Sequence, residues 1–190
     1  MKNNIVKIYY PTTGCAGNFR CCRWLMVGIL FLLCTQIANG QQEREANLKA
    51  AFIYNFTKYI DWDSTKAGDE FVIGVIGPSA VTAPLNEIAR DNEVQNKKIV
   101  IHQFSKPEDI TYTNILFIPQ KLPFSLHAIL EKTEKGTLTV SEEEGFAKQG
   151  TAFNFIIRKD KLKFETNLNA LNAAGLKAGS QLLKLAQLVE

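Results

Sequence analysis

Residues 71–79 read Phe71-Val72-Ile73-Gly74-Val75-Ile76-Gly77-Pro78-Ser79, and this stretch decides the fold. Its first six residues are apolar or glycine on both alternating faces, which is typical of a strand that helices cover on each side. The turn at Gly77 leads directly into a helical pattern. The stretch is therefore predicted to be the first strand of an α/β sheet.

Strand and helix patterns alternate along the rest of the chain. The apolar spacing predicts helices over residues 78–90 and 124–133, and strands over residues 97–104, 114–118 and 137–140. Two more strands, residues 152–158 and 161–166, are joined by Lys159-Asp160, a link that suits a hairpin. Two terminal helices, residues 167–174 and 179–188, are separated at Gly175. The sequence predicts a single three-layer α/β domain: a mostly parallel sheet, helices on both faces and a C-terminal antiparallel hairpin.

Residues 41–62 are predicted to form one helix before this sheet. Its apolar stripe repeats at three- and four-residue steps and consists of Leu48, Ala51, Phe52, Phe56, Tyr59 and Ile60. More apolar residues lie away from the centre of the stripe, namely Ile53, Tyr54 and Trp62. Two interpretations stay open: the helix packs between the sheet and another element, or its surplus aromatic face binds a partner subunit.

Residues 1–40 have the composition of a secretory signal. They contain basic but no acidic residues, then an apolar run over residues 24–33, then Ala38-Asn39-Gly40 with small residues at the −3 and −1 positions. The run is shorter than the roughly 20 residues of a spanning helix. Leu33 also stands where a lipoprotein signal at Cys34 needs a small residue. Cleavage before Gln41 is predicted, which gives a signal peptide over residues 1–40 and one exported, periplasmic domain over residues 41–190.

Removal of this leader changes the charge and the cysteine content. The chain has 22 Lys and Arg against 19 Asp and Glu. Four of the cations precede residue 41, so 18 remain against 19 carboxylates and the mature net charge is −1. This balance does not indicate a nucleic-acid partner. The mature domain is also predicted to lack disulfides and cysteine ligands, because the leader holds all the cysteines: Cys15, Cys21, Cys22 and Cys34.

The candidates for ligand binding lie at the carboxyl ends of two predicted strands, where open α/β sheets bind ligands. Gly77 and Ser79 follow the first strand, and Ser141 follows the fourth and is predicted to cap an acidic turn over residues 142–144. Free amides at such helix starts favour an anion. Turn geometry and capping explain the same residues, since Gly74-x-x-Gly77 lacks the spacing of a dinucleotide fingerprint and a Walker lysine.

No arrangement of residues predicts catalysis or a metal site. His102 and His127 belong to no zinc-binding spacing, and Ser141 has no nucleophile elbow around it. The adjacent carboxylates of residues 142–144 spread around a turn and do not aim at one substrate. We therefore expect no cofactor, no metal and no enzymatic activity.

Basic residues gather along the predicted hairpin, at Arg158, Lys159, Lys161 and Lys163. They form either a positive patch for an acidic partner or edge-strand lysines that discourage aggregation. Combined with the aromatic residues of the first helix, they complete the set of partner-binding candidates: Phe52, Tyr54, Tyr59, Trp62, Arg158 and Lys163.

Seven segments stand in a recognisable order. They are residues 48–62, 73–77, 138–141, 145–155, 161–167, 174–177 and 180–186, with Gly145-Phe146-Ala147, Gly150 and Asn154-Phe155 in the fourth. Together they resemble the YfiR/HmsC-like family of exported bacterial proteins over nearly all of the mature chain. Thr151 stands where a second glycine is usual and Thr166 where an aliphatic residue is usual. Some members carry cysteine pairs in the mature domain, so redox control is not carried over to this chain.

The resemblance implies a periplasmic, non-enzymatic regulator, often a homodimer, that represses an inner-membrane diguanylate cyclase by binding its periplasmic portion. Such members lower cyclic-di-GMP output and biofilm formation. Related domains also occur with sensor kinases, which leaves a kinase as the alternative partner. The alternative function is a periplasmic small-ligand-binding sensor of the solute-binding type that uses the rim at Gly77 and Ser141.

Overall fold

The strand predicted over residues 71–76 is β2 (Glu70–Ile76), and it lies inside an eight-stranded sheet. The structure is a computed structural model that describes residues 40–62 and 68–189. β2 pairs in parallel with β4 (Lys97–Phe104) on one side and with β5 (Ile115–Ile118) on the other. Every second residue of β2 therefore faces the same layer of helices, as the apolar pattern predicted.

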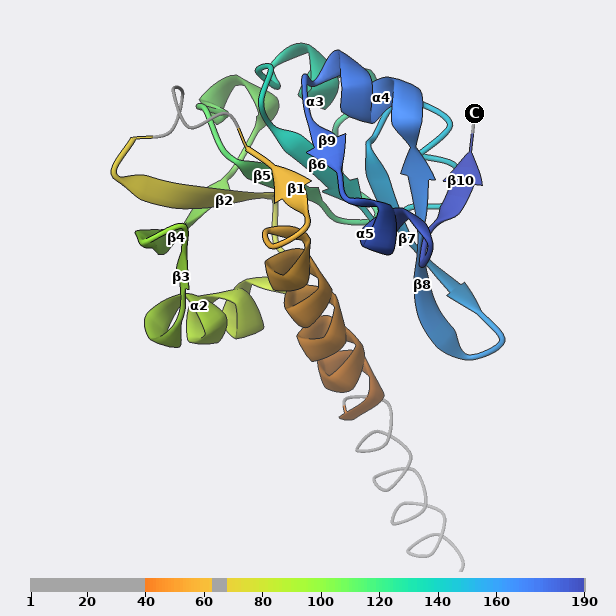
Figure 1. Cartoon of the computed structure of the whole chain (residues 1–190), viewed down its shortest axis with the longest axis horizontal. Helices are drawn as coiled ribbons and strands as arrows, with labels where there is room; N and C mark the ends of the chain where they lie inside the picture. The colour runs from red at the N-terminus through yellow and green to blue at the C-terminus, as the bar shows by residue number, and fades with distance from the viewer. Residues whose placement is uncertain (1–39, 63–67, 190) are drawn as a thin grey trace, which may run out of the picture. The chain divides into compact units, whose positions relative to one another are not determined.

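The strands of the sheet follow in the order β10-β8-β7-β6-β5-β2-β4-β3 (Figure 1). β6 (Leu138–Ser141) and β7 (Phe153–Arg158) continue the parallel set beyond β5. β8 (Lys161–Asn167) turns back antiparallel to β7, and β10 (Gln187–Val189) pairs in parallel with β8. The predicted mostly parallel sheet with a C-terminal antiparallel hairpin is confirmed.

Short strands that the sequence did not predict complete the pairing. β3 (Glu93–Val94) folds back antiparallel on β4. β1 (Ile60–Asp61) and β9 (Lys177–Ala178) form a separate antiparallel pair. This second pair joins the end of the first helix to the segment that follows α4 (Leu168–Ala173).

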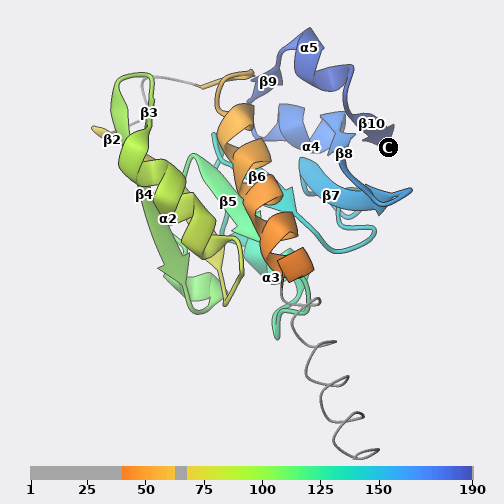
Figure 2. The same ribbon diagram turned by 90° about the horizontal axis from the view of Figure 1, so that it is seen from below.

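Helices cover the sheet on both faces. The first helix, residues 40–56 of the described chain, and α2 (Thr82–Asp91) lie over one face (Figure 2). α3 (Leu126–Glu131) packs on the other face and is capped by the hydroxyl of Ser125, which accepts from the amide of Ala128. The remaining helical segments are short: η1 (Pro107–Asp109), α4 (Leu168–Ala173) and α5 (Ser180–Leu183).

Two apolar cores result from the alternation of side chains along the strands. Phe71, Ile73 and Val75 of β2 belong to the larger core, which the first helix, α2, α4 and α5 also fill. Ile76 belongs to the smaller core, which includes Leu126 and Ile129 of α3. The three-layer arrangement therefore follows from the two-residue period of β2.

Gly74 lets neighbouring side chains approach the backbone of β2 closely. A Cβ atom at this position would lie 2.8 Å from Phe104 and 2.9 Å from Thr113. No side chain fits there without moving these neighbours. The glycine is thus required by the close approach of side chains from β4 and from the segment that leads into β5.

The first helix differs from the prediction in length and in orientation. Its helical residues end at 56, residues 57–59 form a turn, and residues 60–61 form β1. Leu48 is 46% exposed and Tyr59 is 41% exposed, although the sequence placed both in the apolar stripe. Phe56 and Ile60 of the predicted stripe are buried, and the other buried positions of the helix are Ala46, Lys49, Ala50 and Ile53.

The C-terminal prediction was also wrong in part. The helix predicted over residues 179–188 is the four-residue α5, and the chain then extends into β10. The predicted signal peptide over residues 1–40, apart from Gly40, and the centre of the loop before β2 lie outside the described residues. Within the described ranges, no helix has the length and apolar character needed to cross a membrane.

Candidate functional site

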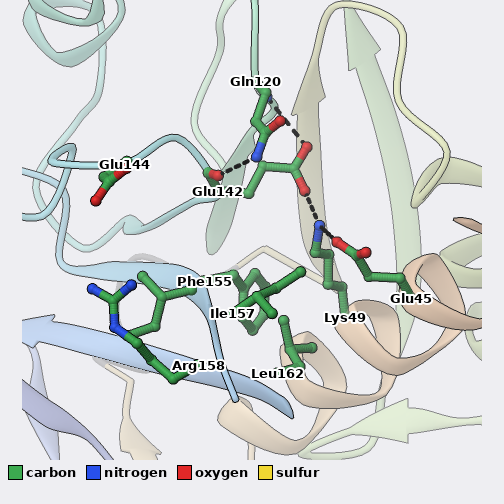
Figure 3. Close-up of a pocket in the computed structure, with 10 residues that line it drawn as sticks. Glu45, Lys49, Gln120, Glu142, Glu144, Phe155, Ile157, Arg158 and Leu162 are labelled. Carbon is green, nitrogen blue, oxygen red and sulfur yellow. Dashed lines mark hydrogen bonds and ion pairs between the residues drawn. The ribbon is translucent and has the colours of Figure 1, made fainter. Parts of the chain in front are cut away.

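A pocket of about 210 Å³ opens between the first helix and the ends of three parallel strands (Figure 3). Its polar wall is formed by Glu45 and Lys49 of the helix, together with Gln120 after β5 and Glu142 after β6. Its apolar wall comes from the β7–β8 hairpin, chiefly Phe155, Ile157 and Leu162, and Arg158 lies at the end of that wall. The pocket therefore lies at the carboxyl edge of the sheet, where α/β folds place their sites.

Lys49 is the centre of the polar wall. Its Nζ donates to Oε2 of Glu142 at 2.5 Å and lies 2.6 Å from Oε1 of Glu45, while the lysine itself is only 8% exposed. Burial alone lowers the pKa of Lys49, but the hydrogen bonds and charges of Glu142 and Glu45 outweigh it and raise the pKa above its ordinary 10.5. Lys49 thus stays protonated, and this makes it unsuited to act as a base or a nucleophile.

Glu142 joins three elements at this point. Besides accepting from Lys49, its Oε1 accepts from the backbone amide of Gln120 at 3.2 Å. Its backbone carbonyl accepts from the side-chain amide of Gln120 at 2.7 Å. The carboxylate and the backbone carbonyl of Glu142 therefore connect the first helix with the ends of β5 and β6.

The predicted rim residues do not line this pocket. Gly77 has a φ of 73° and is buried, and a Cβ on it would meet Leu122 at 2.6 Å, so the glycine serves close packing of the turn. The hydroxyl of Ser79 accepts from the amide of Val81 at 3.2 Å, ahead of α2. Both residues are accounted for by turn geometry, the alternative that the sequence left open.

Ser141 is fully buried and is not a helix cap. Its Oγ lies 2.8 Å from Oγ1 of Thr151 and donates to Oδ1 of Asn154 at 2.7 Å. The side-chain amide of Asn154 in turn donates to Oε2 of Glu165 at 3.3 Å. The predicted cap was wrong because the hydroxyl points into a buried polar network under residues 142–150, where it cannot reach an exposed ligand.

Of the predicted partner-binding residues, Phe52 lies beside the hairpin. Its ring centroid is 6.0 Å from that of Phe155 and 6.2 Å from that of Phe164. Leu48, one turn earlier on the same side of the helix, is 46% exposed, and Ile157 is 53% exposed. We call the half-exposed apolar set Leu48, Phe52, Ile157 and Leu162 the helix–hairpin surface.

The other aromatic candidates lie elsewhere. Trp62 is only 6% exposed, packs edge-to-face on Phe71 at 5.2 Å and donates its indole N–H to the carbonyl of Thr57, so it is a core residue. Tyr54 carries Lys58 above its ring at 4.6 Å. Tyr59 adjoins the β1–β9 pair, where its carbonyl accepts from the amide of Gly179. Arg158 and Lys163 are exposed on the hairpin.

Sequence reasoning missed the central group of the pocket, Lys49 with Glu45 and Glu142. The pair Glu45 and Lys49 has the i, i+4 spacing of a helical ion pair, and that was the available signal. Lys49 and Glu142 are 93 residues apart in the sequence, so no local sequence pattern predicts their contact. Among the described residues, no group of three or more His, Cys, Asp and Glu side chains is arranged to hold a metal ion.

Comparison with known proteins agrees with the resemblance seen in the sequence. No curated protein matches the chain. The family model of YfiR/HmsC-like proteins matches residues 46–187, which includes most of the first helix, the whole sheet except the end of β10, and every residue named in the pocket walls except Glu45. The chain therefore belongs to the YfiR/HmsC-like family, whose members are periplasmic regulators of diguanylate cyclase signalling.

Proposed function

We propose that this protein is a non-enzymatic periplasmic regulator that binds and represses an inner-membrane diguanylate cyclase through its helix–hairpin surface. Family membership supports the type of function. The main observation in favour of this surface is the exposure of Leu48 and Ile157, at 46% and 53%, beside the partly buried side chains of Phe52 and Leu162. Clustered apolar side chains that border charged residues are typical of protein–protein interfaces.

The chemistry of the pocket supports binding over catalysis. Lys49 is neutralised by two carboxylates and held protonated, so its charge is already committed within the protein. Glu142 accepts from Lys49 and from Gln120. Groups that satisfy one another in this way hold elements in place, and none of them is poised to attack a substrate.

The test is repression in cells. The protein is co-expressed with each membrane diguanylate cyclase of the source bacterium that has a periplasmic portion, and cyclic-di-GMP is measured by mass spectrometry. We expect the wild-type protein to lower cyclic-di-GMP with one of these cyclases. Leu48→Arg and Ile157→Asp should each relieve the repression, because a buried charge in an apolar interface is costly.

The matched control is Leu185→Arg, since Leu185 is 70% exposed but lies outside the helix–hairpin surface. This variant should repress as the wild type does. Unchanged cyclic-di-GMP with every cyclase would contradict the regulatory function. Equal repression by the wild type, Leu48→Arg and Ile157→Asp would contradict the proposed surface. Crosslinking in the same cells tests direct contact with the cyclase. Analytical ultracentrifugation of the purified protein tests the homodimer that the family resemblance predicts.

The second candidate function is a small-ligand sensor that works with a sensor kinase. The observation in its favour is the pocket itself, with ionic and apolar walls at the carboxyl ends of β5, β6 and β7. Its volume of about 210 Å³ is below the roughly 300–1,000 Å³ of most ligand sites, which favours the protein partner. A thermal-shift screen separates the two: ligand stabilisation that is lost in Ile157→Trp, which fills the pocket, would favour the sensor.

A further inference from the structure

The turn of the β7–β8 hairpin concentrates positive charge. Residues 158–163 hold four cations, Arg158, Lys159, Lys161 and Lys163, against the single carboxylate of Asp160, a net charge of +3. The rest of residues 41–190 has 14 Lys and Arg against 18 Asp and Glu, a net charge of −4. The hairpin turn therefore carries a net positive charge, whereas the rest of the domain carries a net negative charge. Figure 1 shows this turn at the outer end of β7 and β8.

The strand register places the cations on one face. Arg158 pairs with Lys161, and Lys163 pairs with Ile156, so these three basic residues share the face opposite the first helix. All four cations are exposed, and within the described chain none of them forms an ion pair. Glu144, Lys148 and the buried Glu165 line a surface hollow together with Arg158. We call Arg158, Lys159, Lys161 and Lys163 the basic face.

Ile157 is 53% exposed beside Arg158, but it pairs with Leu162 and therefore lies on the face toward the first helix, apart from the cations. The basic face is thus a cluster of charges without an apolar side chain among them. Such clusters bind the anionic headgroups of a bilayer by electrostatic attraction, which adds roughly five-fold in affinity for each cation near the surface.

We propose that the basic face of the β7–β8 hairpin docks on the anionic lipid headgroups of a membrane. Long, unpaired side chains suit a diffuse anionic surface, because they need no fixed geometry in the partner. Docking through this face leaves the first helix on the other side of the hairpin. A membrane-bound molecule therefore still presents Leu48 and Phe52 to a protein in the same membrane. The inference does not depend on the proposed regulatory function.

The test is co-sedimentation of the purified protein with liposomes. Vesicles of phosphatidylcholine alone are compared with vesicles that also contain phosphatidylglycerol. We expect binding only to the anionic vesicles, and its loss when salt shortens the Debye length from about 10 Å at 0.1 M to about 3 Å at 1 M. Arg158→Gln/Lys161→Gln/Lys163→Gln should weaken binding about 100-fold, because each cation near an anionic surface contributes roughly five-fold.

The matched control is Lys98→Gln/Lys132→Gln/Lys177→Gln, which removes three charges from exposed positions outside the hairpin. It should change binding by about two-fold or less, since charges farther than a Debye length from the lipid are screened. Equal weakening by the two triple variants would overturn the proposal, because net charge alone would then explain binding. Binding to soluble polyglutamate without binding to anionic vesicles would overturn it in favour of an acidic protein partner. Failure to bind either would leave the cations as edge-strand protection and also refute it.

Discussion

Replacing Lys49 with Met is expected to destabilise the domain by about 2–3 kcal/mol. Breaking a buried ion pair costs about 3–5 kcal/mol, because the remaining charge loses its partner. The side chains of Lys49 and Glu142 are 9% and 12% exposed, so the pair is nearly buried. Glu142 keeps the amide of Gln120, and the pocket admits water, so the expected cost is at or just below the lower limit of that range.

Urea unfolding measures this cost directly. A slope of about 2 kcal/mol per molar urea turns the expected loss into a midpoint shift of about 1–1.5 M. The double variant Lys49→Met/Glu142→Gln should recover about 2 kcal/mol relative to the sum of the single variants, since it removes the buried carboxylate and leaves only that of Glu45, whose side chain is 35% exposed. Lys106→Met is the matched control. Lys106 forms an exposed pair with Asp109 at 3.8 Å, so its loss should cost less than about 0.5 kcal/mol.

Additive effects of Lys49→Met and Glu142→Gln would refute this reasoning, since a coupling near zero means that the two charges stabilise the fold independently. A loss in Lys49→Met as small as that in Lys106→Met would refute it too. The second result would show that the helix is held on the sheet chiefly by its apolar contacts, among them Phe56 against Phe153 at 4.8 Å.

Three further predictions follow from the same structure. The carboxylates raise the pKa of Lys49 above 10.5 despite its burial, so the stability it adds is complete below pH 10.5 and is lost as the pH rises through the folded value. The difference in unfolding free energy between wild type and Lys49→Met should therefore shrink in alkaline urea titrations. Gly74→Ala should cost about 1–3 kcal/mol in urea unfolding, because its Cβ meets Phe104 at 2.8 Å, whereas Gly68→Ala, with nothing within 4 Å, should be nearly neutral. Lys159→Asn/Asp160→Gly should stabilise the hairpin by about 1 kcal/mol and raise the melting temperature, since both residues have positive φ, at 51° and 57°.

The interior strands were predictable because each is a short apolar run whose neighbours in the sheet do not alter its pattern. β4 occupies residues 97–104 as predicted, and β5 begins one residue after the predicted start. The hairpin was equally clear, because the two-residue link between β7 and β8 defines its register. Local periodicity was sufficient for β5, which is buried on both faces, and for β4, in which Ile99 and Phe104 are buried.

β10 could not be predicted in the same way. Leu182, Leu185 and Ala186 are spaced as in a helix, and the chain after them is too short to show a strand period. Its extended form comes from pairing with residues 165–167 of β8, a contact that no local pattern records. The buried hydroxyl of Ser141 was missed for the same reason, since its partners Thr151 and Asn154 come from the following segments.

The error in the first helix explains why its apolar surface is exposed. The predicted stripe did not include Lys49, since it was drawn through apolar residues and a lysine is costly to bury without a partner. Glu142, 93 residues away, supplies that partner, so Lys49 takes an inward position next to Ala50 and Ile53. A helix has one inward face, and the residue before Lys49 is then turned outward. Leu48 lies outside the inward face that Ala46, Lys49, Ala50 and Ile53 form, so the orientation that buries Lys49 also exposes Leu48, part of the helical half of the helix–hairpin surface.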